Sequence, residues 1–317
     1  MKNAEKELTV YNKTCLSKRI KKDLGQNKYL YFMMIPIVIY FVLFAYLPMY
    51  GAIIAFKDYK VALGVFESKW VGLQWFYKFM TDLNFTRVFK NTLIISIYSI
   101  LWGFPAPIIF ALFMNEIPGN KFRRTVQTVT YLPHFISMVV VCGLLKQFCD
   151  TGGFISNIAA RLTGTSTNLL NDPDNFRTIY VASGIWQEIG YGSIIYLSAL
   201  TAIDPTLYEA AEIDGAGRLR RIWHISIPGV LPTIVVMFIL RMGSVMTVGY
   251  EKIMLLYSPF TYVKADVIST YVYRIGIGEG NNFSYASAIG LFNSIINVVA
   301  ILLSNWISKK LTNEALW

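Results

Sequence analysis

Charged residues are scarce in this chain of 317 residues, and their scarcity excludes an ordinary soluble domain. Only 15% of the residues are Asp, Glu, Lys or Arg, whereas 55% are hydrophobic and the mean hydropathy is +0.46. A soluble domain usually contains about 25% charged residues. The composition therefore predicts a membrane protein.

Side chains that bind metals, form disulfides or act as nucleophiles are also rare. The three cysteines, Cys15, Cys142 and Cys149, form no CxxC pair, so we expect unpaired thiols without a metal or redox role. Neither of the two histidines has a metal-ligating partner four residues away. We interpret His134 as a packed or interfacial residue rather than a catalytic one, and we predict no metal site.

Motifs for binding nucleotides are missing too. The pattern GxxxxGK[ST] does not occur, so we expect the chain not to hydrolyse ATP, not to be an enzyme and to hold no cofactor of its own. The net charge of +10 could suggest nucleic acid, but the basic residues lie mostly in tails and short loops beside apolar runs, where they determine membrane topology. We therefore expect no nucleic-acid partner.

Long apolar runs, by contrast, are plentiful. A helix needs about 20 apolar residues to cross a bilayer core. Six stretches qualify, namely 29–56, 91–115, 125–145, 178–203, 222–250 and 281–308. Four of them contain no charged residue. The stretch 178–203 contains one, Glu188, and the stretch 222–250 contains one, Arg241. Because strands of a membrane barrel would alternate in polarity, the runs predict an all-α membrane protein with a six-helix transmembrane bundle.

The distribution of basic residues predicts the orientation. With the amino terminus inside, the inside segments hold 16 Lys or Arg and the outside loops hold 11, so both termini should be cytoplasmic. We expect a basic cytoplasmic segment at 1–28, a transmembrane domain at 29–308 and a cytoplasmic tail at 309–317. The transmembrane domain should contain a cytoplasmic loop at 204–228. On the outside we expect an ordered aromatic loop after the first helix and a short helix around 153–162.

The loop between the fourth and fifth runs has an orderly pattern. Asp204 can cap a helix, Pro205 suits its first position, and Gly215 can end it, so the sequence predicts a helix over 205–214. Its alanines would let another surface approach the backbone closely. Further on, Pro228 and Pro232 should loosen the entry into the next crossing, because a proline removes a backbone hydrogen bond.

This stretch resembles the cytoplasmic EAA loop of permease subunits of binding-protein-dependent ABC importers, a pattern usually written EAAx3Gx9IxLP. The matching residues are Glu209, Ala210, Ala211, Gly215, Ile225 and Pro228. Ile227 stands where leucine is usual. Segments 46–59, 91–117, 130–137, 185–217 and 265–277 resemble the sugar-importer branch, and within it the LplB-type permeases that serve complex oligosaccharides.

The resemblance implies the fold of a type I importer permease in a prokaryotic cell membrane. It also implies partners: a second homologous permease, an ATPase dimer that binds ATP and Mg²⁺, an extracellular solute-binding lipoprotein, and a carbohydrate substrate. The residues expected to dock the ATPase are Leu207, Glu209, Ala210, Ala211, Asp214 and Gly215.

Ionisable and hydrogen-bonding residues within the apolar runs are candidates for the substrate pathway. Charges in membrane segments are costly and usually face an aqueous cavity. The candidates are Trp186, Gln187, Glu188, Tyr191, Arg241, Asn293 and Asn297. Alternatively, Glu188 and Arg241 pair or anchor neighbouring helices, and the two asparagines bond to the partner permease.

Three other functions stay open at the level of sequence. The loop motif is shared by importers of other solutes, such as amino acids or peptides. An ion-driven secondary carrier should show repeated halves and paired intramembrane acids, yet Glu188 is the single acid available. A scaffold or sensor would leave the loop pattern without a purpose.

Overall fold

A computed structural model describes residues 22–164, 167–278, 280–312 and 315–316. Most of the predicted basic amino-terminal segment, with Cys15, lies outside the described residues. The long helices are α2 (Lys28–Phe41), α6 (Phe85–Tyr98), α7 (Pro105–Glu116), α8 (Asn120–Tyr131), α9 (Met138–Cys149), α11 (Pro173–Thr201), α14 (Ile227–Met242) and α18 (Phe283–Thr312).

Shorter elements lie between them. These are α3 (Leu47–Met49), α4 (Gly64–Glu67), α5 (Gln74–Thr81), α10 (Phe154–Thr163), α12 (Pro205–Ile213), α13 (Arg218–Arg221), α15 (Tyr250–Leu256), α16 (Tyr262–Ala265) and α17 (Ile268–Tyr273). Strands β1 (Lys57–Asp58) and β2 (Lys69–Trp70) pair antiparallel. The aromatic loop that follows the first crossing is therefore ordered, and the short helix expected after residue 153 is α10.

Five helical stretches are long and apolar enough to cross a membrane, which confirms an all-α membrane protein. They are Lys28–Phe56, Phe85–Glu116, Met138–Leu162, Arg218–Met242 and Phe283–Thr312. The predicted fourth crossing corresponds to α11, which has 29 residues but is less apolar because of side chains such as Gln187 and Glu188. Six crossings and the side of each terminus remain predictions.

Two of the predicted crossings differ from the helices in the structure. The run 125–145 is not one helix, since the 3-10 turn Leu132–Phe135 and extended Ile136 separate α8 from α9. Pro133 has no N–H to continue an α-helix, and Ser137 then caps α9 by accepting from the Val140 amide. The fifth run was expected to reach Tyr250, but α14 already ends at Met242.

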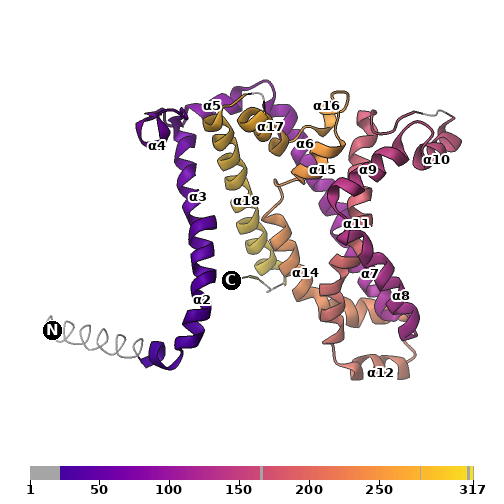
Figure 1. Ribbon diagram of the computed structural model, residues 1–317. Helices are drawn as coiled ribbons and strands as arrows, with labels where there is room; N and C mark the ends of the chain where they lie inside the picture. Colours follow the sequence, from indigo (N-terminus) through magenta and orange to yellow (C-terminus); the bar gives the residue numbers. More distant parts are fainter. Residues whose placement is uncertain (1–21, 165–166, 279, 313–314, 317) are drawn as a thin grey trace.

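Helix α11 lies close to the helices on either side of it. A Cβ on Gly190 would collide with the Thr130 backbone of α8, and one on Gly192 would lie 3.2 Å from Pro107 Cγ of α7. Small residues at such positions allow membrane helices to pack backbone against side chain. Short helices α5, α10, α16 and α17 gather at one end of the molecule, whereas α12 and the start of α2 lie at the other end (Figure 1).

Polar contacts bind the short helices of the upper end in Figure 1 together. The buried Asp266 carboxylate accepts from Arg274 at 2.7 Å and from Arg87 at 3.2 Å. Asp82, at the end of α5, accepts from the hydroxyls of Tyr271 at 2.7 Å and Tyr285 at 2.8 Å. Burial alone would raise the pKa of Asp82, but these hydrogen bonds and one from the Asn84 amide outweigh it and lower the pKa.

Candidate docking helix and transport cavity

Helix α12 begins and ends where its local sequence dictates. Asp204 Oδ1 accepts from the Thr206 amide at 2.9 Å, and this bond lowers the pKa of the carboxyl group. The helix ends at Ile213, one residue before the predicted end. Gly215 then takes a φ of +73°, and the Ala216 amide donates to the Ala211 carbonyl at 2.8 Å. A glycine is favoured here because other residues are strained at positive φ.

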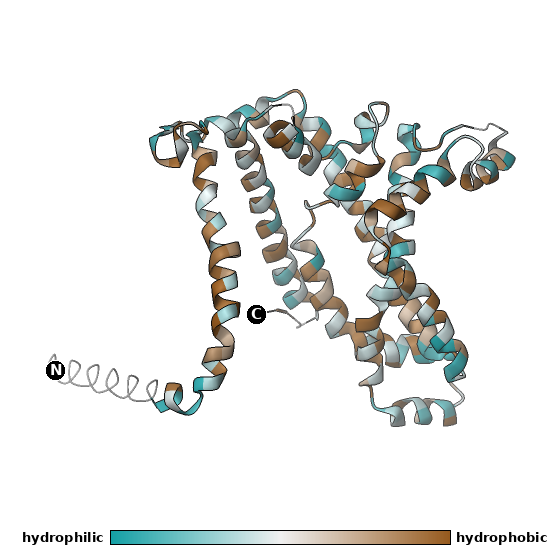
Figure 2. Cartoon of the chain, viewed as in Figure 1, coloured by the Kyte–Doolittle hydropathy of each residue, from teal (hydrophilic) through white to brown (hydrophobic). Residues whose placement is uncertain are grey.

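The helix projects from the end of the bundle with most of its surface exposed (Figure 1). In Figure 2 it is one of the more hydrophilic helices, unlike the largely hydrophobic α2. Of the predicted docking residues, Leu207, Glu209, Ala210, Asp214 and Gly215 are exposed. The remaining one, Ala211, is half-buried and faces the chain.

One exposed apolar residue on this helix was missed by the sequence analysis. Ile213 has 87% of its surface exposed, directly before the turn at Gly215. The signal that could have found it is an isolated apolar residue at the end of a polar helix. The EAA pattern does not specify this position. The exposed isoleucine adds apolar surface beside the small residues of this helix.

Two side-chain contacts hold α12 against the rest of the molecule, and one of them continues through Arg221 to α7. The Tyr208 hydroxyl lies 3.0 Å from Ser226 Oγ. Arg221 Nη2 lies 3.0 Å from Glu116 Oε2 of α7, and its Nη1 lies 3.5 Å from Glu212 Oε2 of α12. Helix α12 thus contacts Ser226 and Arg221 directly, and α7 only through Arg221.

The entry into α14 departs from α geometry, as the prolines predicted. Residues Ile222–Ser226 form a π-helical turn, in which the Ile227 amide donates to the Ile222 carbonyl. Pro228 follows and has no N–H to donate, so the ordinary ladder cannot continue through this point. Such a turn is a common place for a helix to bend.

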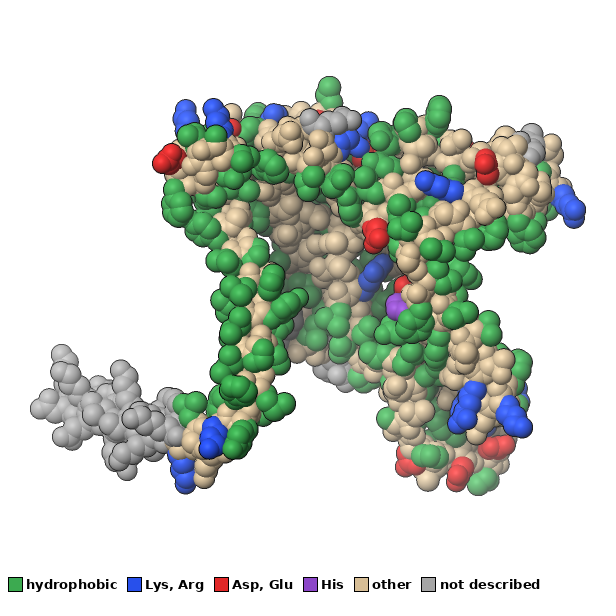
Figure 3. All heavy atoms as spheres, viewed as in Figure 1, with side chains coloured by type: hydrophobic (Ala, Val, Ile, Leu, Met, Phe, Trp, Pro, Cys, Tyr) green, Lys and Arg blue, Asp and Glu red, His purple; other side chains and the backbone are tan. Residues whose placement is uncertain are grey.

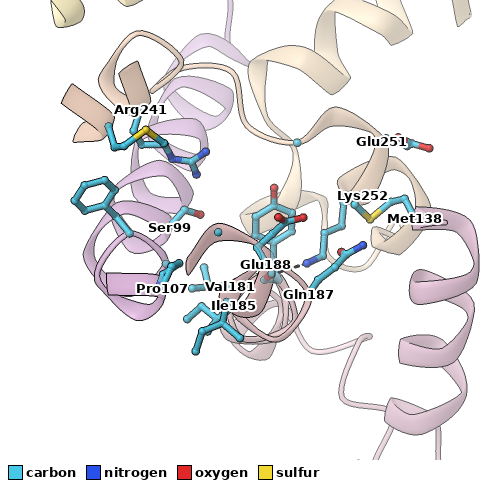
Figure 4. A pocket seen from close by; sticks show the side chains of 18 of the residues that line it. Ser99, Pro107, Met138, Val181, Ile185, Gln187, Glu188, Arg241, Glu251 and Lys252 are labelled. Atoms are coloured by element: carbon cyan, nitrogen blue, oxygen red, sulfur yellow. Dashed lines mark hydrogen bonds between the residues drawn. The ribbon is translucent and has the colours of Figure 1, made fainter. Parts of the chain in front are cut away.

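A cavity of about 680 Å³ lies between α7, α11, α14 and α15. Gln187, Glu188 and Arg241 of the predicted pathway residues line it, and Figure 4 shows them with Lys252. Trp186 and Tyr191 lie outside its lining, although both are well exposed in this chain. Other lining residues named in Figure 4 are Ser99, Pro107, Met138, Val181, Ile185 and Glu251.

Glu188 has a partner other than Arg241. His134 Nδ1 lies 3.0 Å and 3.1 Å from the two Glu188 carboxylate oxygens. The imidazole also stacks on the Tyr191 ring, with centroids 3.7 Å apart and planes 2° from parallel. His134 thus packs at the break after α8 and holds a cavity-lining carboxylate, while Tyr191 stacks on the imidazole.

Lys252 is a cavity residue that sequence reasoning missed, because it falls in a segment expected to be an outer loop. Its side chain is buried, and Nζ donates to the Tyr180 carbonyl at 3.0 Å while lying 4.9 Å from the Tyr180 ring centroid. Gly184 faces this group, since a Cβ there would lie 3.5 Å from Nζ. Burial lowers the pKa of Lys252 to about 8.

Arg241 supplies the second cationic group of the cavity. Within the described part of the chain, its guanidinium makes no hydrogen bond or ion pair, and the residue is exposed. Together with Lys252 it offers charge-assisted hydrogen bonds to a polar or carboxylate-bearing solute. The Glu188 and Gln187 side chains add groups that accept or donate to hydroxyls.

The two asparagines of α18 are not part of the cavity lining. Asn297 Oδ1 accepts from the Met246 amide at 2.8 Å, and its Nδ2 donates to Thr247 Oγ1 at 3.0 Å. Asn297 therefore holds the turn that follows α14. Asn293 Oδ1 is buried, and no hydrogen-bond donor for it lies among the described residues.

The described residues include no group of three or more His, Cys, Asp or Glu side chains that could hold a metal ion. Cys142 and Cys149 of α9 are free thiols buried in the bundle core, where they pack against apolar side chains.

Comparisons with known proteins agree on one family. Residues 103–313 match the family described as the binding-protein-dependent transport system inner membrane component. Protein LplB of Bacillus subtilis is 42% identical over 93% of this chain and 92% of its own length. The polygalacturonan/rhamnogalacturonan transport system permease protein YteP of the same organism is 40% identical over the full length of both.

A solved structure has the same fold. It is a chain of a bacterial alginate ABC transporter in complex with an alginate pentasaccharide-bound periplasmic protein. That chain is 41% identical to this one, with a TM-score of 0.85 over 94% of this chain and 100% of its own.

Proposed function

The chain belongs to the family of binding-protein-dependent transport system inner membrane components, and on that premise we propose that it is one permease subunit of an ATP-driven ABC importer of carbohydrate. The observation that carries the proposal is α12, a helix with defined ends, small residues and an exposed surface, which projects beyond the bundle. A transporter with a cavity in its bundle and a docking helix at one end can couple ATP hydrolysis in a separate subunit to a membrane pathway.

ATP is hydrolysed by a separate ATPase dimer, which binds ATP and Mg²⁺ and docks on α12. Leu207, Ala210 and Ile213 supply contact surface at little cost in side-chain entropy, and Gly215 reverses the chain without a bulky group. The acidic Glu209 and Asp214 add a charged edge. Because α12 faces the same end as the start of α2, this end is the cytoplasmic one in the proposal (Figure 1).

A second, homologous permease completes the membrane pathway. Helix α2 and the turns that follow it, up to Met49, contain no buried residue in this chain. Figure 3 shows hydrophobic side chains along this helix, with open space between it and the rest of the molecule. An apolar helix that packs on nothing in its own chain suits a partner of the same kind.

The cargo is an oligosaccharide, and the cavity favours one with carboxylate groups. Arg241 and Lys252 lie in its wall, and each could bind a sugar carboxylate, while Gln187 can bind hydroxyls. Two relatives support this class by name, since one is a polygalacturonan/rhamnogalacturonan permease and the other belongs to an importer of the acidic polysaccharide alginate.

An extracellular binding lipoprotein delivers the sugar to the opposite end. The periplasmic protein in the alginate transporter supports a partner of this type. The short helices of the outer end are fixed by the carboxylates of Asp82 and Asp266, so they offer a rigid surface for such a contact. The complex would lie in the cell membrane of a prokaryote. The family argues against an ion-driven carrier.

A pair of glycine substitutions tests the proposal. Gly215 and Gly217 lie in the same loop, and a Cβ at either would meet no atom within 4 Å, but Gly215 has a φ of +73° and Gly217 one of −66°. Valine at a positive φ costs about 1–2 kcal/mol, which disfavours the docking conformation roughly tenfold.

We expect the complex with Gly215→Val to insert normally but to lose about tenfold in binding-protein-stimulated ATP hydrolysis and oligosaccharide uptake in proteoliposomes. The Gly217→Val complex should stay close to the unmodified one. Equal activity of both variants would argue that this turn has no part in coupling.

A further inference from the structure

Arg221 lies between three elements at the cytoplasmic end of the proposed permease. It is the last residue of α13, and its guanidinium contacts Glu116, the last residue of α7, and Glu212 of the docking helix α12. The Arg221 and Glu116 side chains are 18% and 10% exposed, whereas Glu212 is 77% exposed. The contact with Glu116 is therefore the shorter and the better shielded from water.

Shielding makes this pair costly to break. Ion pairs at the surface are weak because water screens them, but removing one member of a buried pair leaves the other charge without a partner. Arg221 Nε is also buried, with no hydrogen-bond partner in the part of the chain that the structure describes. The guanidinium is thus oriented by its terminal nitrogens, both of which contact carboxylates.

Helix α7 connects this ion pair to the transport cavity. Its first turn contributes Pro107 to the cavity wall, where α7 touches α11 at Gly192. Immediately before α7, the π-helical turn Ser99–Gly103 contributes both of its end residues to the same wall. A displacement of Glu116 along α7 would therefore reach the cavity.

The other tie of α12 cannot perform this task. Tyr208 bonds to Ser226, which is in the π-helical turn that continues from the same loop into α14. Glu116, in contrast, is separated from Arg221 by 105 residues of sequence. The ion pair is thus a polar link between the docking loop and α7, beside the apolar packing of Ile222 against Ala111 and Leu112 of that helix.

We propose that the Arg221–Glu116 ion pair transmits movement of the docking helix to α7 and so to the wall of the transport cavity. The inference rests on the proposed docking of an ATPase on α12. Arg221 and Glu116 are positioning residues in this mechanism, because neither touches sugar or ATP. Glu212, being exposed, adds little.

Charge reversal and charge exchange test the proposal in the complete importer in proteoliposomes. The variants are Glu116→Arg, Arg221→Glu and the double exchange, and the quantity measured is sugar imported per ATP hydrolysed by inserted complex. We expect each single variant to retain the ATPase subunit on purification and to lose at least tenfold in this ratio, and the double exchange to recover most of it.

Arg220→Glu is the matched control, since Arg220 is exposed and changes charge by the same amount beside the pair. It should leave the ratio unchanged. Unchanged ratios in both single variants would overturn the proposal. So would a double exchange that restores only the amount of inserted protein, because that result shows a purely structural role. If the unmodified chain retained no ATPase, the proposed function itself would fail instead.

Discussion

At the scale of single residues, the linear sequence shows where isolated charges lie but not which side chains surround them. Glu188 and Arg241 stood out because each is the lone charge in an apolar run, and both line the cavity. The partner of Glu188 proved to be His134, 54 residues away and at a helix break. Lys252 could not be predicted, because its burial depends on α15 folding back against α11.

Asp266 gives a prediction on stability. Its fully buried carboxylate bonds to Arg87, Thr270 and Arg274, so Asp266→Asn leaves two guanidinium groups without their counter-charge. We expect a loss of about 3–5 kcal/mol in the free energy of unfolding.

Thermal unfolding of the purified protein in detergent would measure this loss. Asp174→Asn is the control, because Asp174 pairs with Lys264 at the surface, where such a pair contributes about 0–1 kcal/mol. Similar destabilisation by both substitutions would argue against a special role for the buried carboxylate.

The pathway residues give a prediction on accessibility. Gln187 lines the cavity whereas Asn293 lies outside it, although the sequence nominated both. We expect Gln187→Cys to react with a water-soluble thiol reagent in at least one nucleotide state of the assembled importer, and Asn293→Cys to react at least tenfold more slowly in all of them. Both variants should also have Cys15 replaced, and the buried native Cys142 and Cys149 should contribute little background. Preferential labelling at position 293 would show that the pathway follows α18 instead.

At the scale of elements, local signals determined the helix ends that sequence reasoning found. The cap at Asp204 and the turn at Gly215 depend on residues within one turn, so α12 was predicted within one residue. The run 125–145 was mistaken for one helix because apolar residues continue across the break, and hydropathy does not register the missing N–H of Pro133. Helix α14 ends at Met242, and Asn297, far along the chain, accepts from the Met246 amide in the turn that follows.

At the scale of the whole molecule, two surfaces have no cover from the rest of this chain. The apolar surface of α2 has no cover within this chain, and α12 ends in a surface of leucine, alanine and isoleucine that faces away from the bundle. Composition could predict a helical membrane protein, and the spacing of the EAA loop could predict its family. Composition and spacing could not predict the shape of the cavity, because it depends on packing between α7, α11, α14 and α15.

The central claim is that α12 docks a separate ATPase, and site-specific cross-linking tests it most directly. A cysteine placed at Ile213 in the assembled importer should cross-link to a cysteine in the ATPase cleft, and the yield should change when ATP closes the dimer. A cysteine at Leu83 should give no such product, because this residue is 97% exposed and lies between α5 and α6, and α5 is at the end of the molecule opposite α12 (Figure 1). Cross-linking at position 213 that is absent, or no greater than at position 83, in a complex that transports normally would contradict the account.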